Sequence, residues 1–191
     1  MRIVAGSARG RVIQTPKGQT TRPTSMRARE ALFSILGSRL SGTAVLDLFA
    51  GSGAFALESL SRGAGRALCI DSDREAVRCV AANADACGFA CSTAPIAGNA
   101  APAAPLTLWH ADACEALQRA RAAGLRFDII FADPPYESPL LAETLPLCAG
   151  LLTKDGLCIA ESGAPLPPVE GLTVRQTRRY GANHFTFFTT P

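Results

Sequence analysis

Four consecutive residues of the sequence, Asp133-Pro134-Pro135-Tyr136, combine groups that could act on a planar amine. They follow the apolar run 127–132, which is typical of a buried strand that ends abruptly. The two prolines have a fixed φ and no N–H, so the turn is rigid and its carbonyls remain acceptors. The carboxylate of Asp133 could accept N–H bonds from an exocyclic amine while Tyr136 stacks on the ring that carries it. A strand with an ordinary proline turn is the alternative.

A second candidate is the glycine turn at residues 50–53, between an expected strand at 45–49 and a helix that runs to about residue 60. Gly51 and Gly53 lack a Cβ, so a ligand can approach the main-chain N–H groups at the start of the helix. This indicates a loop for a nucleotide-type cofactor. Together with Ala56 the two glycines also satisfy GxGxxA, a pattern that fits a dinucleotide enzyme.

Asp47 favours S-adenosylmethionine over a dinucleotide. Its carboxylate lies four residues before Gly51, where it would repel a pyrophosphate and attract the ammonium group of the methionyl moiety. Asp71 ends the expected strand 67–70, 20 residues beyond Gly51, and is placed to accept both ribose hydroxyls. Turn or helix-capping roles are the alternatives for both aspartates.

Asp112 follows the expected strand 106–110. It could cap the helix 113–123, hydrogen-bond the adenine amine, or do both, because the main chain at Ala113 is exposed there. Phe49 and Ser72 flank these positions, and we include them among the expected cofactor-binding residues. These side chains all follow the carboxyl ends of strands, where ligands of open α/β sheets bind.

Alternating strands and helices, closed by an expected hairpin over residues 173–188, predict the elements that position these groups. We expect an α/β fold: a doubly wound, seven-stranded Rossmann-like sheet with one antiparallel strand. Residues 1–40 are expected to form a basic arm, hairpin and helix, and residues 41–191 the domain that binds S-adenosylmethionine. Residues 88–105 are rich in Ala, Pro, Gly and Ser and are expected to be an irregular loop outside the site.

Positive charge is concentrated at the start of the chain. Residues 1–30 contain seven Arg or Lys and one acidic residue, whereas the whole chain has a net charge of +3. This asymmetry favours a basic segment that meets a polyanion, with a solvated charged extension as the alternative. The arginines expected to contact RNA are Arg9, Arg11, Arg22, Arg27, Arg29, Arg178 and Arg179.

The seven cysteines include no CxxC pair and are expected to be reduced thiols in the cytoplasm. Only two histidines are present, and their spacing to cysteines matches no zinc module, so we expect no metal. No apolar run approaches the length of a membrane span, so we expect no membrane contact, and the protein is expected to be a monomer.

The sequence resembles class I S-adenosylmethionine-dependent methyltransferases through VLDLFAGSG at 45–53, Asp71 and DPPY at 133–136. A narrower set of motifs is similar to the RsmD family, bacterial methyltransferases of guanine N2 in 16S ribosomal RNA. These motifs are RGR (9–11), RPT (22–24), REALF (29–33), FAGSGA (49–54), LSRGA (60–64) and RRYG (178–181).

This resemblance implies a methyltransferase that uses S-adenosylmethionine and acts on ribosomal RNA, within the small subunit or its assembly intermediate. Asp133, Pro134, Pro135 and Tyr136 would be the catalytic residues. The main rival is an amino methyltransferase of DNA or another RNA, acting on adenine N6 or cytosine N4. A noncatalytic RNA-binding module and a dinucleotide dehydrogenase are the remaining alternatives.

Overall fold

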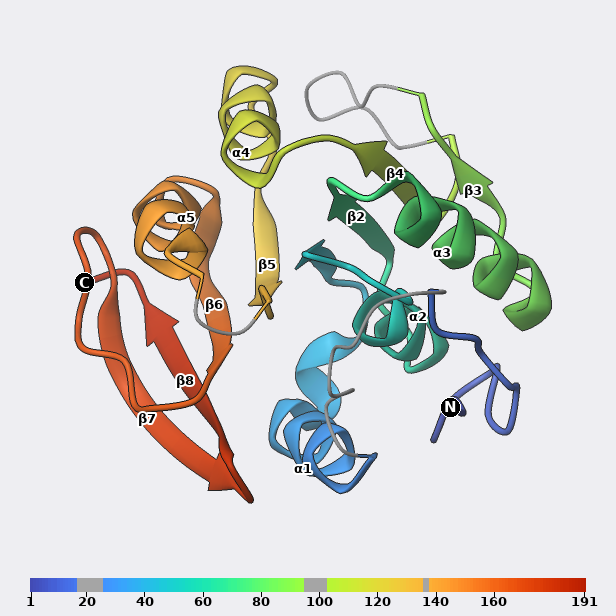
Figure 1. Cartoon of the computed structure of the whole chain (residues 1–191), viewed down its shortest axis with the longest axis horizontal. Coiled ribbons are helices and arrows are strands. Elements are labelled where there is room, and N and C mark those ends of the chain that lie inside the picture. Colours follow the sequence, from blue (N-terminus) through green and yellow to red (C-terminus); the bar gives the residue numbers. More distant parts are fainter. Residues whose placement is uncertain (17–25, 95–102, 136–137) are drawn as a thin grey trace.

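A mainly parallel sheet forms the centre of the molecule (Figure 1). The computed structural model describes residues 1–16, 26–94, 103–135 and 138–191. Along the sheet the strands lie in the order β3-β4-β2-β1-β5-β6-β8-β7. Their bounds are β1 Ala44–Leu48, β2 Arg66–Asp71, β3 Cys91–Ser92, β4 Leu106–His110, β5 Phe127–Ala132, β6 Leu152–Ser162, β7 Thr173–Tyr180 and β8 Asn183–Thr189.

The sheet has one strand more than the seven expected. The additional strand is β3, whose two residues pair in parallel with Leu106 and Thr107 of β4. It lies in the stretch that we expected to be irregular, because two residues are too few to produce a recognisable pattern. The single reversed strand is confirmed: β8 runs antiparallel to both β6 and β7.

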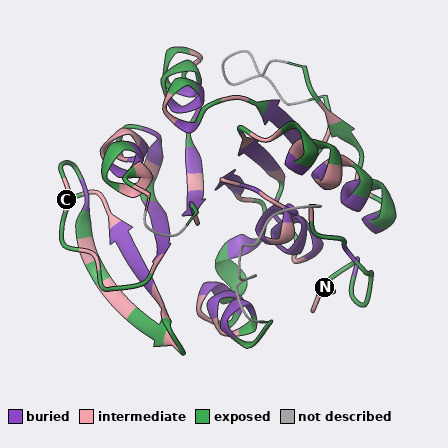
Figure 2. Cartoon of the chain, viewed as in Figure 1, coloured by how far each residue is buried: buried purple, intermediate pink, exposed green. Residues whose placement is uncertain are grey.

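Helices cover both faces of the sheet, as expected for a doubly wound fold. The bounds are α1 Met26–Leu36, α2 Ala54–Ser61, α3 Arg74–Cys87, α4 Ala113–Ala122 and α5 Leu140–Ala149, with a short 3₁₀ helix at Gly37–Leu40. Apolar residues of α1, α2 and α3 pack on one face, and those of α4 and α5 on the other. Figure 2 shows the resulting pattern, with buried strands between helices that expose their outer sides. Among the described residues, no helix is both long and apolar enough to cross a membrane.

The N-terminal segment is docked onto the helices. Arg2 and Val12 form an antiparallel bridge, and Ile3, Ala8 and Ile13 are buried in the same cluster as α1, α2 and α3. The first residues therefore share the core of the sheet.

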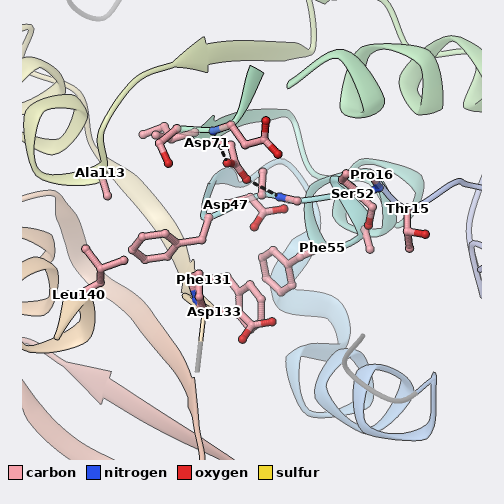
Figure 3. Close-up of a pocket in the computed structure, with 18 of the residues that line it drawn as sticks. Thr15, Pro16, Asp47, Ser52, Phe55, Asp71, Ala113, Phe131, Asp133 and Leu140 are labelled. Carbon is pink, nitrogen blue, oxygen red and sulfur yellow. Dashed lines mark hydrogen bonds between the residues drawn. The ribbon is translucent and has the colours of Figure 1, made fainter. Parts of the chain in front are cut away.

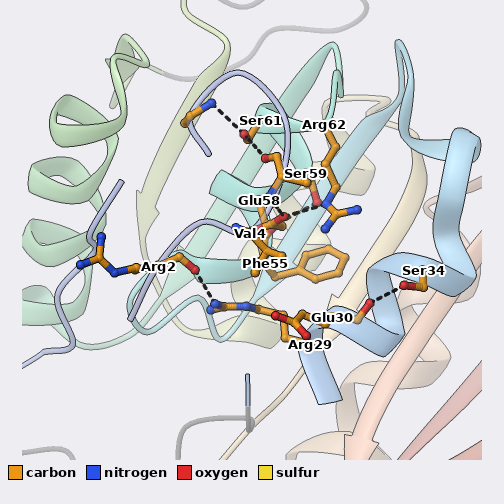
Figure 4. A network of polar contacts seen from close by, with 12 residues as sticks. Arg2, Val4, Arg29, Glu30, Ser34, Phe55, Glu58, Ser59, Ser61 and Arg62 are labelled. Atoms are coloured by element: carbon orange, nitrogen blue, oxygen red, sulfur yellow. Dashed lines mark hydrogen bonds and ion pairs between the residues drawn. The ribbon is translucent and has the colours of Figure 1, made fainter. Parts of the chain in front are cut away.

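Polar groups fix this segment in place (Figure 4). The buried carboxylate of Glu58 accepts hydrogen bonds from the N–H groups of Val4 at 2.7 Å and Ala5 at 3.1 Å. On α3, the buried side chain of Asn83 accepts from the N–H of Gln14 at 2.8 Å and donates to its carbonyl at 2.9 Å. Buried polar groups that are satisfied in this way hold a backbone in one position.

Candidate active site

One cavity of about 350 Å³ lies at the carboxyl ends of the central strands (Figure 3). It extends from Asp112 and Ala113, past Asp71, Gly51 and Asp47, to Asp133 and Pro135. Phe49 and Ser72 also line it. The fold therefore brings together the expected cofactor residues and the acidic, proline-containing turn in one place.

The loop between β1 and α2 forms one wall of the cavity. Gly51 has φ 53° and Gly53, the residue before α2, has φ 73°. At Gly53 an added Cβ would lie 2.7 Å from Cγ1 of Val80, so no larger residue fits without displacement. Among the described residues Phe49 is the only non-glycine with positive φ, at 71°, a strained conformation that is concentrated at functional sites.

Asp47 is buried on β1 at the base of this wall. Its Oδ2 accepts a hydrogen bond of 3.1 Å from the N–H of Ala56. The pKa of Asp47 is raised to about 8, mainly because the carboxylate is buried. The hydrogen bond from Ala56 lowers this pKa, and the nearby charge of Asp71 raises it. A buried carboxylate that lines a cavity is suited to a cationic ligand group, because the cation would lower the cost of its ionisation.

Asp71 connects β2 to the glycine loop. Its Oδ2 accepts a hydrogen bond of 2.8 Å from Gly51, and its Oδ1 accepts one of 2.9 Å from Asp73. Each carboxylate oxygen has a second lone pair, so the aspartate can still accept a pair of hydroxyl groups. Asp73 caps α3 by accepting a hydrogen bond from Glu75.

Asp112 caps α4, which is one of the two roles expected from the sequence. Its Oδ1 accepts hydrogen bonds from Cys114 at 2.9 Å and Glu115 at 3.2 Å. Leu140, at the start of α5, lines the same end of the cavity. The sequence pattern had not indicated Leu140, because its contact depends on how α5 packs beside α4.

The proposed catalytic turn follows β5. Asp133 and Pro135 line the cavity, Pro134 between them is buried, and Tyr136 lies outside the described residues. Phe131, two residues earlier, pairs with Asp47 across β1 and β5, so its side chain lies on the same face of the sheet. Its ring stacks on Phe55 with centroids 4.3 Å apart, and both rings line the cavity. Sequence reasoning missed this aromatic wall, since buried phenylalanines are usual in any core.

Most of the expected RNA-binding arginines are on the surface. Arg9, Arg11, Arg27, Arg178 and Arg179 are exposed, whereas Arg22 lies outside the described residues. In the view of Figure 1, α1 lies between the N-terminal segment and the β7–β8 pair, which carry most of these arginines.

Arg29, which is also among the arginines expected to contact RNA, is not on the surface. Only 5% of this residue is exposed, and its Nη2 donates a hydrogen bond of 2.7 Å to the carbonyl of Arg2. Its position on the inner side of α1, among Ala28, Leu32 and Phe33, places the guanidinium beneath the N-terminal segment. The helical pattern of apolar residues around it was the signal that could have indicated burial.

Comparison with known proteins agrees with this geometry. A model of the family described as "Conserved hypothetical protein 95" matches residues 1–189. The chain belongs to this family. The resemblance to the RsmD family is confirmed, and the protein is an RsmD-family methyltransferase.

Two relatives of this RsmD-family methyltransferase illustrate the similarity. The "Putative rRNA methyltransferase YlbH" of Bacillus subtilis is 33% identical over 186 residues, which are 95% of this chain and 94% of the relative. The "Ribosomal RNA small subunit methyltransferase D" of Escherichia coli K12 is 34% identical over 174 residues, 88% of this chain and 79% of the relative.

Solved structures show the same fold. The putative methyltransferase yhhF from Escherichia coli has a TM-score of 0.81 at 29% identity and covers all of this chain and 97% of its own. A ribosomal protein L11 methylase from Lactobacillus delbrueckii has a TM-score of 0.68 at 19% identity over 93% of this chain and 84% of its own. That second similarity concerns the fold alone.

Proposed function

We propose that this RsmD-family enzyme transfers a methyl group from S-adenosylmethionine to the exocyclic N2 of a guanine in small-subunit ribosomal RNA. The observation that carries the proposal is the single cavity that joins Asp112, Asp71 and Asp47 to Asp133 and Pro135. A relative named as a ribosomal RNA small subunit methyltransferase supports the choice of RNA over DNA. We expect such an enzyme to act in the cytoplasm as a monomer.

The residues of the cavity fit S-adenosylmethionine. Asp47 would hold the methionyl ammonium, Asp71 the ribose, and Asp112 with Ala113 the adenine, while the glycine loop lets the donor lie close to the main chain. The donor supplies an electrophilic methyl group on a positively charged sulfur. The neighbouring carboxylates of Asp47 and Asp71 are of the sign that favours a cation there.

Asp133 has the central part in the mechanism. An exocyclic amine is a poor nucleophile, because its lone pair is delocalised into the ring. By accepting an N–H bond, Asp133 and the Pro134 carbonyl would favour a pyramidal nitrogen and direct its lone pair at the methyl carbon. The new C–N bond forms as the C–S bond breaks, and the electron pair of the broken bond stays on sulfur. The nitrogen then loses its extra proton to Asp133 or to water.

Methyl transfer to small-subunit particles tests this proposal directly. Purified protein, labelled methyl donor and particles from cells that lack the enzyme would be combined, and the product RNA digested to nucleosides. We expect N2-methylguanosine; methylated adenine or cytosine, or methylation of DNA alone, would overturn it. Asp133→Ala should abolish transfer and still bind S-adenosylmethionine, whereas Asp85→Ala, on the exposed side of α3, should remain active.

The exposed arginines provide a test of RNA binding. Replacing Arg9 and Arg11 by Ala should weaken binding and reduce the slope of log affinity against log salt by about one for each lost phosphate contact. The same slope in the double variant would assign the N-terminal segment a role in folding alone.

A further inference from the structure

One side of the cavity has a wall made by the first 40 residues. Met1, Thr15 and Pro16 of the N-terminal segment line it together with Arg29 and Leu32 of α1. The segment that we expected to be an RNA-binding arm therefore borders the cavity that also contains Asp133. Of these wall residues, Arg29 is the one with a charged side chain.

Two of the three nitrogen atoms of the Arg29 guanidinium have a partner in the protein, and the third does not. Its Nη2 donates to the carbonyl of Arg2, and its Nη1 contacts the sulfur of Met1 at 2.7 Å. Among the residues that the structure describes, its buried Nε has no hydrogen-bond partner. Figure 4 shows the guanidinium extending from α1 toward Arg2, close to Phe55. A buried donor without an acceptor is costly, and a ligand that brings an acceptor removes that cost.

The carboxylates nearest to Arg29 have other partners or lie in solvent. Glu58 accepts hydrogen bonds from Val4 and Ala5 and forms an ion pair with Arg62 at 2.7 Å. Glu30, the next residue of α1, is exposed. The structure thus holds the guanidinium in place without an ion pair of its own among the described residues.

We propose that Arg29 reads the target base, with its Nε–H donating a hydrogen bond to O6 or N7 of the guanine whose N2 is held at Asp133. This inference rests on the proposed function. When N2 points to Asp133, the opposite edge of guanine presents only the acceptors O6 and N7. Adenine carries an N6 amine in the place of O6, so a donor that contacts O6 of guanine would face a donor in adenine.

The surroundings of Arg29 favour a base edge over a phosphate. Leu32 and Phe55 beside it are apolar and buried, and they line the cavity with it. A flat ring can enter such a site, whereas a phosphate would lose its hydration against apolar side chains.

The experiment combines enzyme variants with altered bases. Small-subunit particles would be reconstituted around ribosomal RNA that carries, at the methylated position, guanine, 2-aminopurine without O6, or 7-deazaguanine without N7. The wild-type enzyme and Arg29→Met would be compared by kcat/KM and by affinity for each particle without donor. We expect removal of the contacted atom to lower wild-type kcat/KM and affinity about tenfold or more, and to leave Arg29→Met unaffected.

Controls separate the alternatives. Arg29→Lys, which keeps the charge and replaces the Nε–H donor by a methylene group, should behave as Arg29→Met toward the altered bases if Nε makes the contact. Arg78→Met, an exposed change on α3, should keep the wild-type response. Affinity for S-adenosylmethionine and thermal unfolding report whether a variant is folded.

Equal responses of wild type and Arg29→Met to both altered bases would overturn the assignment. A uniform loss of RNA affinity, whatever the base, would place Arg29 on a phosphate and would also overturn it. The proposed function fails separately, if the wild-type enzyme methylates no guanine in the unaltered particle.

Discussion

The carboxylate of Asp71 accepts a hydrogen bond of 2.8 Å from the main-chain nitrogen of Gly51. A residue at the end of β2 thereby holds the loop that follows β1, although the two lie 20 positions apart. The proposed ribose acceptor is thus also a support of the glycine turn.

Asp71→Ala should therefore weaken the binding of S-adenosylmethionine by more than the loss of ribose contacts alone. We expect at least a tenfold rise in Kd by calorimetry, because hydrogen bonds to a charged group contribute about 1.5–3 kcal/mol each. Asp85→Ala, on the exposed side of α3 and away from the cavity, is the control and should leave Kd within about threefold. Similar affinities of wild type and Asp71→Ala would show that Asp71 does not hold the donor.

The stability of the ligand-free protein should fall as the pH rises from about 4 to about 8. The pKa of Asp47 is about 8 in the fold and 3.8 in its ordinary state, so the folded protein favours the protonated form. The contribution of Asp47 to the free energy of unfolding is fully present below pH 3.8 and is lost as the pH rises through about 8. Urea unfolding across this range should show a loss of several kcal/mol that Asp47→Asn lacks. Parallel curves for the two proteins would contradict a buried, raised Asp47.

Gly53→Ala should destabilise the protein by about 1–3 kcal/mol. The new Cβ would lie 2.7 Å from Cγ1 of Val80, and the residue would have to keep a φ of 73°. Gly124→Ala is a matched control, since Gly124 has φ 70° and nothing within 4 Å of the added Cβ. Its cost in chemical unfolding should reflect backbone strain alone. Equal losses of unfolding free energy for the two variants would show that the Val80 side chain can move away from the new Cβ without destabilising the protein.

Glu58→Ala should cost about 3–5 kcal/mol in free energy of unfolding, because it removes a buried carboxylate that accepts three hydrogen bonds. It leaves the N–H groups of Val4 and Ala5 without their acceptor and Arg62 without its 2.7 Å partner. Glu75 pairs with Arg78 at the surface, so Glu75→Ala should cost no more than about 1 kcal/mol. A small effect of Glu58→Ala would mean that the N-terminal segment is only loosely attached.

Several elements follow from local sequence. The helix expected from residue 74 to about 87 is α3, because Asp73 caps it and Gly88 ends it in a left-handed conformation. The strand before Asp133 and the turn around Gly51 were equally recognisable, since their patterns lie within ten residues. By contrast, β3 has two residues and its existence depends on pairing with β4.

The role of Arg29 shows where local reasoning ended. Its place among seven basic residues in the first 30 predicts an exposed residue that contacts RNA. The fold places it inside because α1 packs its apolar side on the sheet and carries the arginine with it. The number of basic residues in a segment predicts that most of them are exposed, but it does not show which one is buried.

The sequence by itself determined the order of strands and helices, the glycine turn, the acidic ends of β1 and β2 and the Asp-Pro-Pro corner, since each depends on neighbours along the chain. The tertiary structure decided that these groups share one cavity and that Asp47 is buried beside Phe131. It also decided that the N-terminal segment forms one wall of this cavity. Such placements depend on contacts between residues dozens of positions apart, where packing and buried hydrogen bonds rather than local propensity select the arrangement.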